Sequence, residues 1–174
     1  MRNESREPLL SRDYRLVPKG WSVALLVAAF IAMVSGLAQS VTVRAAEPLQ
    51  RLEIASTGGK SHVFQVELAR TEKEREKGLM FRRYMPKDRG MLFDFGHPEP
   101  AAMWMENTYL PLDMVFIRAD GTIARIETHA EPLSRRVIAA GEDVLGVLEL
   151  NAGVCDELGI RAGDRVIHPM FKAR

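Results

Sequence analysis

The segment from Met103 to Ile117, which reads MWMENTYLPLDMVFI, mixes groups that can do chemistry with groups that build a core. Carboxylate, amide and hydroxyl side chains stand there between aromatic and aliphatic ones. Polar groups in an apolar frame need partners, because burying them unpaired costs free energy. They therefore either hold a loop against the core or face a ligand. The polar members are Glu106, Asn107, Thr108 and Asp113, and the apolar frame contains Trp104, Tyr109, Leu112 and Phe116.

Two interpretations of this segment stay open. In the first, Asn107, Thr108 and Asp113 bond nearby backbone amides and stabilise a turn. Pro111 fits that interpretation, since proline fixes its own backbone and restricts the residue before it. In the second, Asn107 and Asp113 orient a small polar ligand such as a sugar, and Trp104 supplies an apolar wall.

An arginine pair directly after the GLMF sequence could extend such a site. One of the two, Arg82 or Arg83, could pair with Asp88, Asp94 or Asp113 while the other points to solvent, because a guanidinium at a core edge commonly binds a carboxylate. If Arg82 instead faces the 103–117 segment, it would recognise an anionic group. The predicted ligand-binding residues are Trp104, Asn107, Thr108, Asp113 and Arg82.

A hydrolase that uses Asp113 or Glu106 as general base is the alternative activity. Sequence spacing does not show that any two carboxylates lie at the distance from each other that hydrolysis requires. The catalytic residues therefore stay unassigned. The chain has no Gly-x-Ser-x-Gly elbow, and Cys155 lies near the apolar residues Val154 and Leu158, where a buried, inert thiol is expected. A protein-interaction domain is a third possibility, and it predicts an exposed apolar patch.

Neither a metal site nor a cofactor is predicted. The four histidines are scattered, without a helical pair or a cysteine partner. A metal site built from His97 with Asp94 or Glu99 is an alternative. From residue 47 onward, the chain has 18 Lys and Arg residues and 20 Asp and Glu residues, so its formal net charge is −2. That balance gives no basic surface for nucleic acid.

The segment 1–38 is predicted to be a signal peptide or an uncleaved signal anchor. Basic residues precede an uncharged apolar run from Trp21 to Ala38, as in a secretory leader. Cleavage could follow Ala38 or Ala45. The segment 39–50 is predicted to be a tether. The following domain is then periplasmic or secreted, or anchored to the inner membrane through the leader.

The segment 51–174 is predicted to form a single globular domain. Alternating apolar residues predict strands over 62–68, 90–95, 102–105, 114–118, 122–127, 144–150 and 165–168. A capping box at Thr71 and Glu74 begins a helix that ends near Gly78, and a second short helix covers 152–158. Asp120-Gly121 predicts a hairpin, and the prolines of residues 97–100 should interrupt regular structure. The pattern predicts a compact, β-rich α+β domain with a small barrel-like, mainly antiparallel sheet.

Several linked segments resemble the domain of unknown function 192 family. They are EREKGLMFR (residues 74–82), GMLFDF (90–95), MWMENTYLPLDMVFI, the ADGTI hairpin and GIRAGDRV (159–166). The resemblance covers about residues 52–169. It implies a small β-rich domain, often exported, and no known activity. The family's motif residues correspond to Trp104, Met105, Asn107, Thr108, Pro111 and Asp113, whereas the frequent lysine before the asparagine is Glu106 here.

The sequence thus predicts an exported, uncharacterised binding or accessory module. Any ligand site is expected around residues 103–113, and the hydrolase and the interaction domain remain as alternatives.

Overall fold

The computed structural model describes residues 48–171. The chain divides into two units, Met1–Ala45 and Ala46–Arg174, and only the second falls within the described residues. The predicted leader and most of the predicted tether therefore lie outside them. Within residues 48–171, no helix is both long and apolar enough to cross a membrane.

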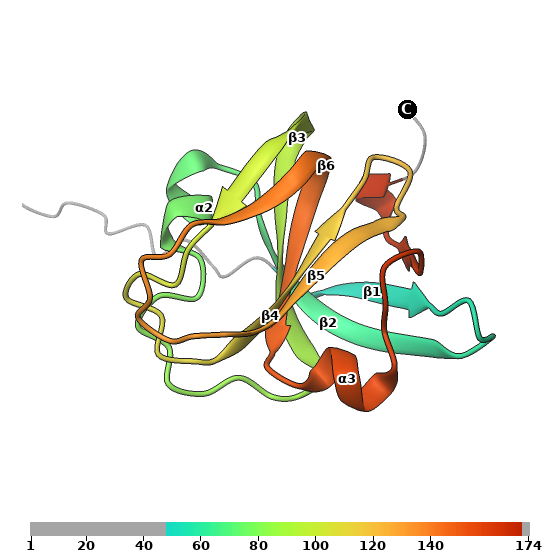
Figure 1. Cartoon of the computed structure of the whole chain (residues 1–174), viewed down its shortest axis with the longest axis horizontal. Coiled ribbons are helices and arrows are strands. Elements are labelled where there is room, and N and C mark those ends of the chain that lie inside the picture. Colours follow the sequence, from blue (N-terminus) through green and yellow to red (C-terminus); the bar gives the residue numbers. More distant parts are fainter. Residues whose placement is uncertain (1–47, 172–174) are drawn as a thin grey trace, which may run out of the picture. The chain divides into compact units, whose positions relative to one another are not determined.

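A seven-stranded sheet forms the body of the domain, in the order β5-β4-β6-β3-β2-β1-β7 (Figure 1). Neighbouring strands run antiparallel except for β2 and β3, which are parallel. The helices α2 and α3 lie well apart, on different sides of the sheet (Figure 1). The elements are β1 (Gln50–Ala55), β2 (Ser61–Ala69), α2 (Glu72–Lys77), β3 (Arg89–Met103), β4 (Leu112–Ile117), β5 (Ile123–Ala130), β6 (Ile138–Asn151), α3 (Val154–Leu158), β7 (Arg165–Ile167) and the 3-10 turn η1 (Pro169–Phe171).

The two edge strands of the sheet meet, which confirms the barrel-like prediction. Thr122, just before β5, forms an antiparallel bridge with Arg165 of β7. The Val166 amide donates to the Gly121 carbonyl at 2.8 Å. A Cβ added to Gly121 would lie 2.6 Å from the carbonyl oxygen of Val166, which is too close for any other residue. Glycine therefore permits the close approach that joins the edges.

Helix α2 begins and ends as its sequence predicts. The Glu74 amide donates to the Thr71 hydroxyl at 3.3 Å, and the Glu74 carboxylate accepts from the Thr71 amide at 3.0 Å. Gly78 ends the helix at a φ of +43°. No residue of α2 is buried, so this helix is held by its caps and by the buried Leu79 directly after Gly78.

The prediction that residues 97–100 break regular structure is wrong. Strand β3 continues through both prolines to Met103, with register shifts between Asp94 and Glu99 and between Pro100 and Ala102. β2 pairs with β3 only over residues 89–93, so one edge of β3 is free of this partner from Asp94 onward. A proline that donates no amide hydrogen bond is tolerated at such an edge.

Two apolar clusters occupy the two faces of the sheet. Side chains alternate between faces along a strand, so neighbours in sequence enter different clusters. On β6, Leu148 and Leu150 belong to one cluster and Val147 to the other. On β4, Val115 belongs to the first cluster and Met114 to the second. The polar residues of these strands, Asp113 and Glu149, consequently point to opposite faces.

Candidate functional site

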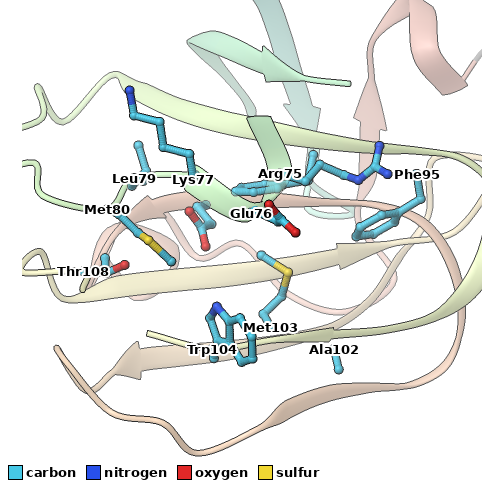
Figure 2. A pocket seen from close by; sticks show the side chains of 13 residues that line it. Arg75, Glu76, Lys77, Leu79, Met80, Phe95, Ala102, Met103, Trp104 and Thr108 are labelled. Carbon is cyan, nitrogen blue, oxygen red and sulfur yellow. The ribbon is translucent and has the colours of Figure 1, made fainter. Parts of the chain in front are cut away.

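A cavity of about 190 Å³ opens beside α2, between this helix and the end of β3. Sites for drug-sized ligands have volumes of roughly 300–1,000 Å³, so this smaller cavity suits a molecule of few heavy atoms. Helix α2, its following turn, β3, the 104–108 loop and β6 all contribute to the wall (Figure 2). The lining residues are Arg75, Glu76, Lys77, Gly78, Leu79, Met80, Phe93, Phe95, Ala102, Met103, Trp104, Thr108 and Glu149.

Glu149 is the unusual member of this wall. Its position on β6 lies between Met91 of β3 and Met114 of β4 in the sheet register. Only 4% of the residue is exposed, and no hydrogen bond from residues 48–171 reaches its carboxyl. Burial raises the pKa of this carboxyl to about 8, against a weaker opposite effect of the Arg82 guanidinium. The group is therefore mostly protonated at neutral pH while the cavity holds no charged partner.

Trp104 forms a more open part of the wall than Glu149 does. The residue is 52% exposed, so its indole is accessible from solvent. Figure 2 shows the thioethers of Met80 and Met103 near the indole, facing the same space. These side chains offer polarisable, apolar surface. The site thus combines one buried acid with aromatic and thioether walls.

Charged side chains at the rim have different orientations. The Arg75 guanidinium donates to the Asp94 carbonyl at 3.0 Å and lies 5.9 Å from the centre of the Phe95 ring. Figure 2 shows the Lys77 side chain directed away from Met103 and Trp104, and the Glu76 carboxylate directed toward them. At this part of the rim, the Glu76 carboxylate therefore faces the cavity and the Lys77 ammonium does not.

Asn107 and Thr108 support the loop that carries Trp104. Asn107 has a φ of +55°, a conformation that asparagine adopts more readily than most residues. Its carbonyl accepts from the Phe81 amide at 2.9 Å, and its side-chain amide contacts the Met80 sulfur at 3.9 Å. Thr108 is 5% exposed and donates to the Glu106 carbonyl at 3.2 Å. Thr108 lines the cavity, and Asn107 positions its neighbours.

Asp113 lies on the other face of the sheet and does not line the cavity. The residue is fully buried, and its two carboxylate oxygens accept from the His129 amide at 3.0 Å and the Cys155 amide at 2.9 Å. The carboxylate therefore ties the end of β5 and the start of α3 to β4. Cys155 is buried as predicted, and burial together with Asp113 raises the pKa of its thiol.

Of the two arginines, Arg83 lies 4.7 Å from the centre of the Tyr109 ring, and Arg82 does not pair with Asp88, Asp94 or Asp113. Its guanidinium binds Glu67 of β2 through both terminal nitrogens, at 2.5 and 2.6 Å. This pairing raises the pKa of Arg82 and lowers that of Glu67. The sequence offered no reason to prefer Glu67, because only the fold brings β2 beside the turn that carries Arg82.

The remaining candidate acids and ligands are exposed or paired. Glu106 forms a salt bridge with Arg135 at 2.8 Å and does not line the cavity. His97 lies 3.3 Å from Glu99 on the surface of β3. Among the described residues, no group of three or more His, Cys, Asp or Glu side chains could hold a metal ion.

The structure therefore brings Trp104 and Thr108 together and leaves Asn107, Asp113 and Arg82 outside the lining. Sequence reasoning missed Glu149. One signal was present: the strand 144–150 reads VLGVLEL, in which a single acid stands among residues that are otherwise apolar or glycine. An acid in a strand that is buried on both faces must either find a partner or face a cavity.

Comparison with known proteins agrees with the fold. A family model described as "Uncharacterized ACR", the domain of unknown function 192, matches residues 53–168. A crystal structure from Sinorhizobium meliloti 1021, named a "putative transcription regulator", is 50% identical, with a TM-score of 0.68 over 68% of this chain and 92% of that chain. A protein of unknown function from Novosphingobium aromaticivorans DSM 12444 is 39% identical, with a TM-score of 0.67 over 69% of this chain and 85% of that chain. No curated protein matches the chain.

Proposed function

The chain belongs to the domain of unknown function 192 family, and we propose that it is an exported binding module for a small polar ligand. The family carries no established activity, so the proposal rests on the cavity beside α2. Trp104 and Thr108, both predicted from sequence to bind ligand, line that cavity.

The observation that carries the proposal is the Glu149 carboxyl, which lines the cavity without a hydrogen-bond partner among residues 48–171. A buried polar group without a hydrogen bond costs the protein stability, about 1–3 kcal/mol for a neutral group. Such a group calls for an explanation, and a ligand that supplies the missing partner is one. Glu149 lines the cavity, and Trp104 gives the same cavity an aromatic wall that solvent can reach.

The hydrolase alternative receives less support from the geometry. Both oxygens of Asp113 accept backbone amides, and Glu106 pairs with Arg135. Neither acid lines the cavity. A general base must reach the proton that it removes, so Glu149 would be the acid to test in a search for hydrolysis.

A protein-interaction role has one specific observation in its favour. Backbone hydrogen bonds join the loops that contain Phe81, Asn107 and Leu133. The Phe81 amide donates to the Asn107 carbonyl at 2.9 Å, and the Leu133 amide donates to the Thr108 carbonyl at 3.1 Å. Phe81 and Leu133 both have positive φ angles and exposed side chains. The exposed apolar residues of these loops are Phe81, Tyr84, Trp104, Tyr109, Leu133 and Val137.

Export is part of the proposal because of the leader, with its basic flank and apolar run over residues 21–38. The domain would then work in the periplasm or beyond it, or on an inner-membrane anchor. The formal net charge of −2 from residue 47 onward supports a partner other than nucleic acid. The name of the Sinorhizobium relative, a "putative transcription regulator", does not change this proposal.

Trp104 provides a direct test of ligand binding. The chain has two tryptophans, Trp21 in the leader and Trp104 at the cavity, so Trp21→Phe leaves Trp104 as a single fluorescent reporter. A library of small polar metabolites should contain compounds that change its emission and raise the melting temperature. Glu149→Gln should abolish both effects, while Glu142→Gln on the exposed end of β6 should keep them. A library without any such compound would refute the proposal.

A further inference from the structure

The walls of the cavity restrict the chemistry of its ligand. Apart from Glu149, the side chains deep in the wall are apolar or already bonded: Phe93 is buried, and the Thr108 hydroxyl donates to the Glu106 carbonyl. A sugar carries several hydroxyl groups, and each would need a partner on desolvation. This wall offers too few partners for several hydroxyl groups.

A cation has different needs, and this cavity meets them. One carboxylate neutralises its charge, and aromatic faces attract it through their electron-rich centres. Glu149 supplies the carboxylate and Trp104 the aromatic face. Around them, the thioethers of Met80 and Met103 offer polarisable surface to the alkyl part of a ligand (Figure 2).

The rim also favours positive charge. The Glu76 carboxylate is directed toward the cavity, whereas the Lys77 ammonium is directed away (Figure 2). Arg75 is held by the Asp94 carbonyl beside the Phe95 ring. Behind the wall, Arg82 is neutralised by its two bonds to Glu67.

From these contacts we infer that the cavity binds a small organic cation of the substituted-ammonium type, with its charged nitrogen between Glu149 and Trp104. This inference rests on the proposed function and narrows its ligand class. Binding would require the Glu149 carboxylate, so a proton would leave this group as the cation enters.

The release of that proton gives the inference a pH signature. The pKa of Glu149 is raised to about 8, so cation affinity should increase as pH rises from about 6 to about 8. Other charged groups line the same cavity or act on this acid: Arg75, Glu76 and Lys77 from α2, and Arg82 with its partner Glu67. The Glu149→Gln variant separates the contribution of Glu149 from theirs.

Four probes test the inference on the full chain carrying Trp21→Phe, purified in nonionic detergent. Tetramethylammonium has a permanent charge, tert-butanol has a similar shape without charge, acetate is an anion, and glucose is a neutral sugar. Tetramethylammonium should change Trp104 emission and raise the melting temperature, and tert-butanol should bind more weakly. Glu149→Gln should weaken tetramethylammonium binding about tenfold or more and remove its pH dependence. The matched Glu142→Gln variant should change neither property.

The possible failures are distinguishable. Binding of glucose or acetate in a manner that depends on Glu149, without binding of tetramethylammonium, would overturn the cation inference and leave the proposed function intact. Equal affinity for tetramethylammonium and tert-butanol, or binding that survives Glu149→Gln, would also overturn it. If none of the four probes changes Trp104 emission or the melting temperature, both the inference and the proposed site are contradicted.

Discussion

Two buried carboxyl groups on neighbouring strands of this sheet have opposite surroundings. Asp113 of β4 lies opposite Leu150 in the register, and Glu149 of β6 lies opposite Met114, so the two acids point to different faces. Asp113 accepts two backbone amides, whereas Glu149 has no hydrogen-bond partner within residues 48–171. Burial alone therefore does not distinguish the two acids; the absence of a hydrogen-bond partner does.

A third buried acid behaves like Asp113. Asp164 is 2% exposed and accepts from the Thr57 amide at 2.8 Å and the Arg161 amide at 2.9 Å. It joins the turn before β7 to the loop between β1 and β2. Of the three buried acids in the described part of the chain, two hold loops together and Glu149 lines a cavity.

The largest expected effect concerns Asp113. Asp113→Ala leaves the buried amide of Cys155 and the partly buried amide of His129 without acceptors, so the free energy of unfolding should fall by about 3–5 kcal/mol. Urea unfolding measures this change. The matched control is Asp120→Ala, since Asp120 accepts the Thr122 amide at 2.8 Å in an exposed turn. The control should cost under about 1 kcal/mol. A similarly small loss for Asp113→Ala would remove the contrast between the two acids.

The second prediction concerns the pH dependence that Glu149 contributes. Its pKa is about 8 in the folded protein and 4.5 as the unfolded reference, so between these values the folded state holds a proton that the unfolded state has released. Stability from this group is therefore lost as pH rises. As pH rises from about 5 to about 7, the free energy of unfolding of the parent should fall by about 2 kcal/mol relative to that of Glu149→Gln. Urea unfolding at several pH values measures the difference, and a constant difference would show that Glu149 ionises normally.

The third prediction addresses Asn107, which supports the loop without lining the cavity. Its φ of +55° is unfavourable for most side chains. Asn107→Ala should therefore cost about 1 kcal/mol, whereas Asn107→Gly should be nearly neutral. Thermal unfolding of both variants checks this. If the two variants unfold alike and ligand binding is lost in both, Asn107 contacts the ligand directly.

The smallest effect on stability is expected for Trp104. Replacement of a core tryptophan by alanine would lower the free energy of unfolding by about 3–5 kcal/mol. Trp104 is 52% exposed, so Trp104→Ala should cost under about 1 kcal/mol while removing ligand binding. Calorimetric titration with a ligand found in the library would measure the loss of affinity. Unchanged affinity would place the ligand away from the indole.

Local patterns in the sequence predicted most of the secondary structure. The Thr71–Glu74 capping box, the Asp120-Gly121 hairpin and the helix that Gly159 ends all occur where expected. These features depend on residues close in sequence, where backbone preferences and short-range hydrogen bonds suffice. The error at residues 97–100 arose because the free edge of β3 that tolerates the prolines depends on where β2 stops, which no local pattern reveals.

The candidate site was only half predictable for the same reason. The sequence singled out the 103–113 segment and thereby Trp104 and Thr108, and it determined that Glu149 stands in an apolar strand. It could not assign Asp113 to one face of the sheet and Glu149 to the other, since that depends on strand register. Tertiary structure alone decided which acid found two amides and which was left facing a cavity, because the surroundings of both come from segments distant in sequence.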